Sequence, residues 1–405
     1  MMRLKIPTAK NLWEENLEQA AALIQSNENF LFSADIDPDS VGAMVSLALY
    51  LRIMGKQVYI VLSNSLGENL DHLEKMIEYN KIHTLRNADE IAGVKNGIDV
   101  VIFCDTANSK LIPFFPTIRE HLLSRNVPVI EIDHHFGADS EKLADQAVTL
   151  YQNANATTEI TGELLKKIHQ KNPDLPHPFN QRNIVISILT GILGDTMGGR
   201  VVSHKQSYVQ WMGTLGNKLK RNTRLRKPNG VRPGDDRATK FQNPQQIQKY
   251  LTRLSREQEI CLNALQQRMV TDGEVESLNL LNSTYSEVEA FCRPFDSPWF
   301  TYILGFLLSQ ISDSTTSSTK LGCIYFHGKN AEDKDCIYIK IRRSGHYSGI
   351  DLRTTESHLR NAFQDKYMGG GGHPGAVSFR VHCHDETLFL ANFERIITAI
   401  KKTLV

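Results

Sequence analysis

The sequence VPVIEIDHH, residues 127–135, is the most informative stretch of this chain. Its apolar run from Val127 to Ile132 predicts a short buried strand, and Asp133, His134 and His135 follow directly. Open α/β sheets place their sites at the carboxyl ends of their strands. A carboxylate and an imidazole together suit a divalent metal ion. A lone buried histidine is more often a satisfied core residue, but Asp-His-His at a strand end favours a metal site.

Three further acidic segments follow apolar runs in the first half of the chain. Asp35, Asp37 and Asp39 come after the run at 29–34, Asp105 after the run at 100–104, and Asp195 after the run at 184–193. In extended chain the first three carboxylates face one side, where their charges repel unless a cation lies among them. The alternative for each segment is a turn or a helix end, which aspartate also favours. The segments together predict a metal centre built from several strand ends.

A glycine-rich segment lies in the last quarter of the chain. Gly369–Gly372 is followed by His373, and an Arg-Ser pair ends a strand-like run upstream. Backbone amides of a glycine run can bind phosphate, and the guanidinium group matches phosphate geometry. This pattern predicts a phosphate-binding site, with a plain turn and a solvated arginine pair as the alternatives. The residues concerned are Arg343, Ser344, Gly370, Gly371, Gly372 and His373.

Composition limits the classes of protein that remain. The chain has 405 residues, 41% hydrophobic and 22% charged, which is ordinary for a soluble globular protein. A net charge of +1 excludes a global field that would recruit polyanions. The N-terminus lacks a signal-peptide pattern, and no apolar run approaches the ~18 residues of a membrane span. Six scattered cysteines are expected to be reduced, so we predict a cytoplasmic protein without a membrane partner.

The chain is expected to have an α/β fold in two domains. Residues 1–200 alternate predicted strands with a predicted helix at 41–54, which favours a parallel sheet. Residues 201–273 include a basic, loop-like segment at 218–240 and then one long helix at 245–270. This helix is expected to connect the two domains. Residues 274–405 form a second, smaller α/β domain. The predicted strands are 29–34, 58–62, 100–104, 127–132, 321–326, 336–341 and 376–381.

The combination of motifs resembles the DHH phosphoesterase superfamily with a DHHA1 C-terminal domain. The features shared are an acidic first motif, a strand-end aspartate, Asp-His-His, Gly-x-x-x-Asp-Thr and the late Gly-Gly-Gly-His. Among its members the chain resembles bacterial oligoribonuclease/pAp-phosphatase proteins, cyclic-dinucleotide phosphodiesterases and RecJ-type nucleases. The basic segment near 205–245 has no counterpart there. The resemblance implies a metal-binding domain and a substrate-binding domain with a cleft between them.

The resemblance also implies a ligand set for two divalent cations, with Mn²⁺ as the first choice and Mg²⁺ or Co²⁺ as alternatives. Asp37 resembles a ligand of one ion, Asp39 a ligand of the other, and Asp105 the bridge between them. His134 and Asp195 resemble the remaining ligands of the second ion. Two-metal hydrolases hold their ions roughly 3.5–4 Å apart and activate a water molecule.

Other residues are expected to support this ligand set, and one position departs from the family pattern. Asp133 and His135 resemble residues that support the ligands or contact the substrate, and the glycine segment with Arg343 resembles a substrate clamp. The family usually has a histidine four residues before Asp37, where this chain has Ser33. Serine is a poor Mn²⁺ ligand, so Asp35 is the candidate that replaces the histidine.

The function implied is metal-dependent hydrolysis of short nucleotidic phosphoesters. Candidate substrates are short oligonucleotides, linear or cyclic dinucleotides, and 3′-phosphoadenosine 5′-phosphate. Two alternatives stay open: a nucleotide-binding sensor with a weakened metal site, and a single-strand exonuclease of the RecJ type. The expected partner is the nucleotide substrate, and a homodimer is compatible with the sequence.

Overall fold

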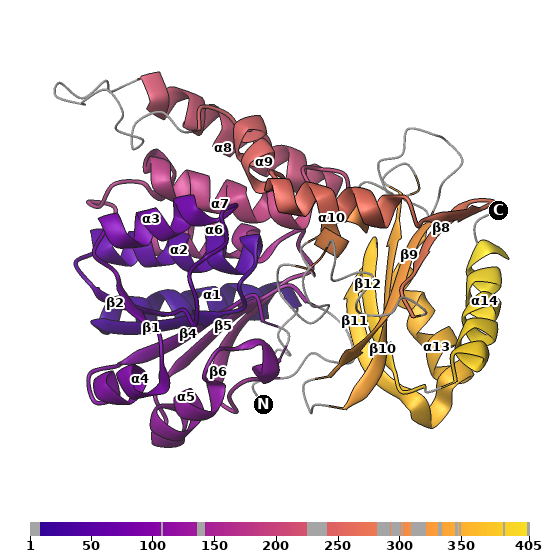
Figure 1. Ribbon diagram of the computed structural model, residues 1–405. Helices are drawn as coiled ribbons and strands as arrows, with labels where there is room; N and C mark the ends of the chain where they lie inside the picture. Colours follow the sequence, from indigo (N-terminus) through magenta and orange to yellow (C-terminus); the bar gives the residue numbers. More distant parts are fainter. Residues whose placement is uncertain are drawn as a thin grey trace, which may run out of the picture. The chain divides into compact units, whose positions relative to one another are not determined.

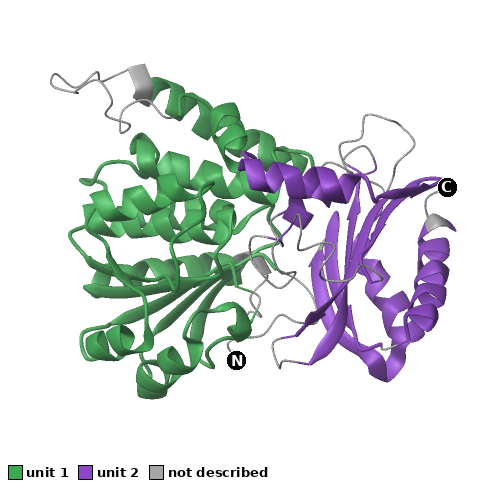
Figure 2. Ribbon diagram, viewed as in Figure 1, with its two compact units in different colours: residues 1–135, 141–251 green, residues 136–140, 252–405 purple. Residues whose placement is uncertain are grey.

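The computed structural model describes residues 9–106, 108–135, 142–224, 241–281, 292, 300, 303–308, 321–330, 334–344, 347, 350–383 and 385–402. The chain divides into two compact units, one running up to Leu251 and the other beginning at Thr252 (Figure 2). Each unit is built on its own six-stranded sheet. Within the described part of the chain, no helix is long and apolar enough to cross a membrane.

The first unit contains a fully parallel sheet with the strand order β3-β2-β1-β4-β5-β6 (Figure 1). Its strands are β1 (Asn29–Ala34), β2 (Gln57–Val61), β3 (His83–Leu85), β4 (Val100–Cys104), β5 (Val129–Asp133) and β6 (Ala147–Tyr151). Its helices are α1 (Ala9–Ser26), α2 (Pro38–Ile53), α3 (Asp71–Tyr79), α4 (Ala88–Val94), α5 (Phe115–His121), α6 (Thr157–Lys171), α7 (Arg182–Asp195), α8 (Lys205–Arg224) and α9 (Pro244–Leu251).

Helices cover both faces of the parallel sheet, because the connections between parallel strands must cross over a face. Phe30 and Phe32 of β1 belong to one apolar core together with α2, α6 and α7. Leu31 belongs to the opposite core with Ile91 of α4 and Ile118 of α5. Side chains alternate along a strand, so a strand that is apolar at every position is buried on both faces. The predicted α/β class and parallel sheet are therefore confirmed.

Two predictions for the segment after α7 are wrong in detail. The basic segment predicted to be a loop from Lys218 is helical through Arg224, because good helix formers continue α8 while Leu219 is buried. The remainder of that segment, 225–240, lies outside the described residues. The single helix predicted at 245–270 is two helices, α9 and α10 (Arg256–Gln266), because Ser255 forms a capping box with Gln258 and starts a new helix.

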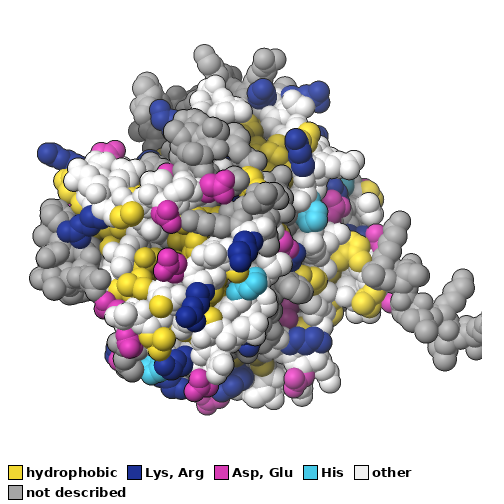
Figure 3. Space-filling view, turned by 90° about the vertical axis from the view of Figure 1, so that its right-hand side faces the viewer, with side chains coloured by type: hydrophobic (Ala, Val, Ile, Leu, Met, Phe, Trp, Pro, Cys, Tyr) yellow, Lys and Arg dark blue, Asp and Glu magenta, His cyan; other side chains and the backbone are white. Residues whose placement is uncertain are grey.

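The second unit contains a mixed sheet with the order β11-β12-β10-β9-β8-β7. Its strands are β7 (Val270–Asp272), β8 (Val275–Asn279), β9 (Leu321–Lys329), β10 (Asp335–Arg343), β11 (Tyr367–His373) and β12 (Ala376–Val381). Helices α13 (Thr355–Phe363) and α14 (Glu386–Lys402) cover one face. Helix α10 and the helical residues 303–308 pack on part of the other. In the view of Figure 3, the coloured basic and acidic side chains are interspersed.

The cysteines differ from the sequence-based expectation in one pair. Cys261 of α10 and Cys292 form a disulfide, although we expected every cysteine to be reduced. They are 31 residues apart and meet because both lie in the core beneath α10, a contact that no local spacing could reveal. The other four cysteines are buried thiols. The cytoplasmic location stays a prediction.

Candidate metal centre

The edge formed by the carboxyl ends of β4 and β5 brings the strand-end residues together. These strands are direct neighbours, and the Asp105 amide donates to the Ile132 carbonyl over 2.7 Å, so Asp105 lies beside the Asp133-His134-His135 segment. Asp105 has a φ of 52°. Aspartate tolerates this left-handed conformation better than most residues, and its carboxylate is buried here.

His134 lies at the centre of the cluster and is 3% exposed. Its Nδ1 lies 3.2 Å from the Ala154 carbonyl oxygen and must donate to it, which makes Nε2 the nitrogen that carries the lone pair. Nε2 lies 3.2 Å from Asp195 Oδ2, 3.5 Å from Asp105 Oδ1 and 3.8 Å from Asp39 Oδ2. Three carboxylates from three separate segments therefore surround one imidazole nitrogen.

Asp39 is held by the first turn of α6. Its carboxylate accepts hydrogen bonds from the backbone amides of Thr157, at 2.5 Å, and Thr158, at 3.0 Å, and from the Thr158 hydroxyl at 2.7 Å. Gly191 of α7 makes room for this arrangement, because a Cβ there would lie 2.5 Å from Asp39 Oδ1. The helix end fixes the direction of the carboxylate, so Asp39 is preorganised.

The first acidic motif does not continue the strand. Strand β1 ends at Ala34, Asp37 is the N-cap of α2, and Asp39 lies in its first turn. The expectation that three carboxylates face one side of an extended chain is therefore wrong, because Pro38 starts the helix there. The Asp37 carboxylate accepts hydrogen bonds from the Asp39 amide (2.7 Å) and from the Ser40 amide and hydroxyl (both 2.9 Å).

Asp133 and His135 form a supporting pair beside Asp105. Asp133 Oδ1 accepts hydrogen bonds from the His134 amide (2.8 Å) and the His135 amide (3.1 Å), and lies 2.8 Å from His135 Nδ1. His135 Nδ1 also lies 3.4 Å from Asp105 Oδ1. Although burial raises the pKa of Asp133, the hydrogen bonds and charge of His135 and the charge of His134 together lower it overall.

Burial and mutual repulsion destabilise the charged form of several carboxylates in the cluster and so raise their pKa values. Burial, with the charge of Asp105 next, raises the pKa of Asp37 to about 7. Burial also raises the pKa of Asp39 and of Asp105, with Asp195 contributing to both. The pKa of Asp35 rises to about 6 because of burial and the charge of Asp37. A divalent cation would relieve this repulsion, so the electrostatics fit a metal site.

Two groups of three side chains have the spacing that a metal ion requires. One consists of Asp105, His134 and His135, and the other of Asp39, His134 and Asp195, with ligand atoms within 4.8 Å of one another in each group. Oxygen with imidazole is a donor set that Mn²⁺ and related ions accept. Asp35 and Asp37 belong to neither group, and their predicted ligand roles stay predictions.

The residues that orient these ligands were not predicted from the sequence. Ser40 Oγ donates to Asp105 Oδ2 (3.0 Å) and Thr157 Oγ1 donates to Asp105 Oδ1 (2.7 Å). Thr158 and the Ala154 carbonyl hold Asp39 and His134 in the same way. The Thr157-Thr158 pair before an apolar helix was a visible cap signal, but nothing local connected it to aspartates more than fifty residues away.

Metal-free protein is expected to become less stable as pH rises from about 5 to 8. The pKa of Asp37 is 3.8 in the unfolded chain and about 7 in the fold, so its stabilising contribution is complete below pH 3.8 and is lost as pH rises through about 7. Burial lowers the pKa of His135, but Asp105 and Asp133 together raise it from 6.5 to about 9, so His135 also loses its stabilising contribution as pH rises. Thermal unfolding in chelator at pH 5 and pH 8 measures this.

The matched variant is Asp37→Asn, because asparagine is an equally good N-cap for α2. It should flatten the dependence of the unfolding midpoint on pH. Mn²⁺ should raise the midpoint of the unmodified protein more at pH 8 than at pH 5, where protons compete for the same oxygens. Equal Mn²⁺ shifts at both pH values would contradict this account.

The candidate clamp residues of the second unit lie on two strands. Arg343, at the end of β10, is 8% exposed and donates to the Ile350 carbonyl, and burial lowers its pKa. Ser344 is also buried. The glycine segment is the edge strand β11 rather than a compact turn or cradle. The side chain of His373 lies outside what the structure describes.

Two glycines of β11 are needed for the strand to pair with β12, in addition to their predicted role in phosphate binding. Gly370 and Gly372 have φ values of 142° and 146°, which disfavour other residues. A Cβ at either position would lie 2.3 Å from a carbonyl oxygen of β12. The close pairing of β11 with β12 therefore requires these two glycines whether or not they bind phosphate.

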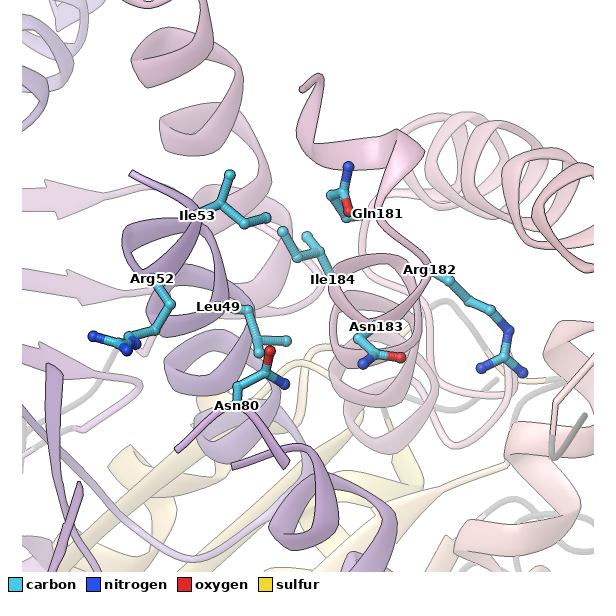
Figure 4. Close-up of a pocket in the computed structure, with 8 residues that line it drawn as sticks. All are labelled: Leu49, Arg52, Ile53, Asn80, Gln181, Arg182, Asn183 and Ile184. Carbon is cyan, nitrogen blue, oxygen red and sulfur yellow. The ribbon is translucent and has the colours of Figure 1, made fainter. Parts of the chain in front are cut away.

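A separate pocket lies at the other end of the α2–α7 helix pair (Figure 4). It has a volume of about 490 Å³ and is lined by the last turn of α2, Asn80, and residues 181–184 at the start of α7. The metal-ligand cluster lies at the start of α2 and the end of α7. The length of α2 puts the two sites roughly 20 Å apart. None of the predicted site residues lines this pocket.

The fold and the cluster define an α/β protein with a prearranged group of carboxylates and imidazoles whose spacing suits divalent cations. Residues 29–192 match the family model described as the DHH family, N-terminal domain. The first unit therefore contains a segment similar to the N-terminal domain of the DHH family. A search of curated proteins found no match.

Solved structures resemble the chain over nearly its whole length. An exopolyphosphatase-related protein from Bacteroides fragilis has 16% identity and a TM-score of 0.63, covering 96% of this chain and 98% of that one. A DHH domain described as a member of the s1p family of ribosomal proteins has 13% identity and a TM-score of 0.53, covering 95% and 91%. RecJ with Mn²⁺ from Thermus thermophilus has 16% identity and a TM-score of 0.47, covering 96% and 55%. At these identities the first two structures support the fold of both units and nothing more. The similarity to the third is too low to support any conclusion.

Proposed function

We propose that this chain is a divalent-metal-dependent hydrolase of short nucleotidic phosphoesters, with Mn²⁺ as the preferred cation. The observation that carries the proposal is the convergence of Asp39, Asp105 and Asp195 on Nε2 of His134. Like charges gathered in a buried site cost stability unless cations lie among them. The match of residues 29–192 to the DHH family model, together with the resemblance to DHH phosphoesterases, supports phosphoester hydrolysis as the reaction class.

The residues divide into ligands and supports. Asp39, His134 and Asp195 would hold one cation, and Asp105 with Asp37 would serve the other, Asp105 being shared. Divalent cations supply Lewis acidity and lower the pKa of a water molecule when bound. Thr157 and Ser40 fix the Asp105 carboxylate by hydrogen bonds.

His135 has a role of its own in this proposal. Although burial disfavours the imidazolium, the charge of Asp105 and the hydrogen bond and charge of Asp133 together raise the pKa of His135 to about 9 in the metal-free protein. Held by Asp133 at 2.8 Å, it can donate a hydrogen bond to a phosphoryl oxygen and stabilise the charge that develops there. His135 thus contributes to catalysis without being a required metal ligand.

A nucleotide sensor without hydrolytic activity is the less favoured hypothesis for the same site. A protein that only binds a nucleotide has no need of three carboxylates converging on one imidazole, or of the hydroxyl groups that orient them. The RecJ-type exonuclease reading depended on the basic segment, whose residues 225–240 are not described.

A substrate panel tests the proposal. Purified protein with Mn²⁺ should hydrolyse at least one of these: a two- to five-residue RNA, a linear or cyclic dinucleotide, or 3′-phosphoadenosine 5′-phosphate. Inorganic polyphosphate and long single-stranded DNA complete the panel. Hydrolysis of polyphosphate alone would overturn the nucleotidic assignment, and digestion of long DNA in preference to short strands would favour the exonuclease.

Asp35 is proposed to replace the histidine that the family usually has at the position of Ser33. We expect Asp35→Asn to raise the Mn²⁺ concentration needed for half-maximal activity, because a carboxylate binds the cation more strongly than an amide. Ser33→Ala is the matched control. The Ser33 hydroxyl is buried and makes no hydrogen bond to the described residues, so its removal should change neither metal dependence nor stability. Identical Mn²⁺ titrations for all three proteins would exclude Asp35 as a ligand.

The clamp assigned to Arg343, Ser344, the β11 glycines and His373 is likewise a proposal. Gly371 lacks the positive φ of its neighbours, so Gly371→Val can keep the strand while it crowds the backbone amide. We expect a higher KM for nucleotides at nearly unchanged kcat, since lost ground-state binding appears in KM. Bound Mn²⁺, measured by elemental analysis, should not change. A variant with normal KM would show that Gly371 has no role in substrate binding.

A further inference from the structure

The pocket between the last turn of α2 and the start of α7 takes no part in the proposed reaction. All the residues that line it belong to the first unit. Its volume of about 490 Å³ lies within the range of pockets that bind small organic molecules, roughly 300–1,000 Å³. The chemistry of its lining therefore indicates which class of molecule it suits.

The middle of the pocket is aliphatic. Leu49 and Ile53 are one helical turn apart on α2, and Ile184 of α7 points toward Ile53 (Figure 4). Leu49 and Ile184 are buried core residues, and Ile53 packs against the same core while it stays partly exposed. These three side chains are called here the aliphatic strip. Such a strip can pack against the face of a flat ring.

Three carboxamide groups surround the aliphatic strip. They belong to Asn80, at the end of α3, and to Gln181 and Asn183, at the start of α7. Asn80 Nδ2 donates to the Met76 carbonyl over 2.7 Å, so its Oδ1 is the atom available to accept. The side chains of Gln181 and Asn183 form no hydrogen bond with any described residue. A carboxamide donates and accepts in one plane, as the edge of a nucleobase requires.

The charged residues of the pocket are both cations. Arg52 and Arg182 line it, and none of the described lining residues is acidic. Arg52 donates to the Lys56 carbonyl (2.8 Å) and to the Gln57 side chain (3.4 Å), and Arg182 donates to the Phe241 carbonyl (3.0 Å). Neither forms an ion pair within the described part of the chain. Each guanidinium has five N–H donors, so both keep donors for a ligand.

The position of the two guanidinium groups limits what they can contact. They extend away from the aliphatic strip, one on each side (Figure 4). Arg182 Nε is buried without a hydrogen-bond partner among the described residues, and burial lowers the pKa of Arg182 with no acid to offset it. A negative group at the side of a ligand would relieve this cost.

We propose that this pocket binds a mononucleotide, with the base on the aliphatic strip, its edge bonded to the carboxamides and its phosphate beside a guanidinium group. A mononucleotide combines the three features that the lining requires: a flat apolar face, donors and acceptors in one plane, and negative charge. The metal-ligand cluster lies roughly 20 Å away, at the other ends of α2 and α7. The pocket is thus a second site, and binding there does not depend on the proposed hydrolysis.

The test is calorimetric binding of adenosine 5′-monophosphate to the full-length protein in excess EDTA, so that no cation holds phosphate at the metal centre. Asn183→Leu removes a carboxamide at nearly constant size and should weaken binding by ~10-fold, the effect of losing a paired contact to the base. Asn217→Leu, at an exposed position of α8, is the matched control and should leave Kd unchanged.

Two partial ligands separate recognition of the base from recognition of the phosphate. Adenosine and ribose 5-phosphate should each bind at least ~10-fold more weakly than the mononucleotide, since each lacks one set of contacts. In the double variant Arg52→Met with Arg182→Met, adenosine and the mononucleotide should bind equally. Ribose 5-phosphate that binds as well as the mononucleotide would overturn the proposal, because the base would then make no contribution.

The place of binding is tested by crosslinking with 8-azidoadenosine 5′-monophosphate in EDTA, followed by peptide mapping. Label is expected on the segments 49–53, 80 or 181–184. Ile53→Trp fills the pocket from a partly exposed position and should abolish both labelling and binding, which provides an answer if Asn183→Leu fails to fold. Label confined to the second unit, or unchanged Kd in both variants, would overturn the proposal. Either result leaves the hydrolase proposal standing, because that rests on turnover with Mn²⁺.

Discussion

Asp105→Asn is expected to lower kcat/KM for phosphoester hydrolysis by at least ~10²-fold, the scale of losing a principal electrostatic element of catalysis. Asp105 has one carboxylate oxygen near both histidines and another held by Ser40. Asparagine keeps the size and tolerates the left-handed backbone at this position, so the change removes charge and little else. Steady-state kinetics with saturating Mn²⁺ measure the loss.

The control for Asp105→Asn is Asp145→Asn, which removes the same charge from an exposed position of the first unit. It should retain full activity. Asp105→Asn should also bind fewer Mn²⁺ ions by calorimetry, while its thermal midpoint in chelator stays equal or rises because repulsion among carboxylates is relieved. Near-normal turnover by Asp105→Asn would mean that the site is misplaced.

His134→Gln is expected to have an effect of similar size, at least ~10²-fold in kcat/KM. The imidazole is the common member of both candidate ligand groups, and the Ala154 carbonyl sets which nitrogen faces the carboxylates. Glutamine cannot present a nitrogen lone pair to a cation, because its amide nitrogen only donates. The loss should therefore appear in bound Mn²⁺ as well as in rate.

A comparison among histidines sharpens this prediction. His135→Gln should lose less activity than His134→Gln. We assign His135 a hydrogen bond to the phosphoryl group, whereas His134 belongs to both candidate ligand groups. His83→Gln, at an exposed position of β3, should have no effect on rate or metal content. If His135→Gln loses bound Mn²⁺ as completely as His134→Gln does, the assignment of the two histidines must be reversed.

Local sequence patterns predicted much of the fold because the first unit is regular. The run at 29–34 has adjacent apolar residues from Phe30 to Phe32, and such a run bounded by polar residues fits a strand buried on both faces. Asp105, His134 and Asp195 could be proposed from their positions at the ends of such runs. Neighbouring parallel strands end at the same edge of a sheet, so strand-end residues are brought together by the fold itself.

The features that escaped prediction all depend on contacts between distant segments. Asp39 is held by Thr157 and Thr158, which are more than a hundred residues away in the sequence. The direction of Arg343 depends on strand register, and a shift of one residue would have placed Arg342 on the core face instead. The Cys261–Cys292 disulfide arises from packing beneath α10 and has no sequence motif. Spacing along the chain carries no information about such partners.

The central claim is that the cluster around His134 is a cation-dependent hydrolytic centre. The most direct measurement is hydrolysis of a dinucleotide by protein dialysed against chelator, before and after addition of Mn²⁺, with bound metal measured in the same samples. The account predicts no turnover without metal, and activity that rises with bound Mn²⁺ until the site is filled. Undiminished hydrolysis by protein shown to contain no metal would contradict it.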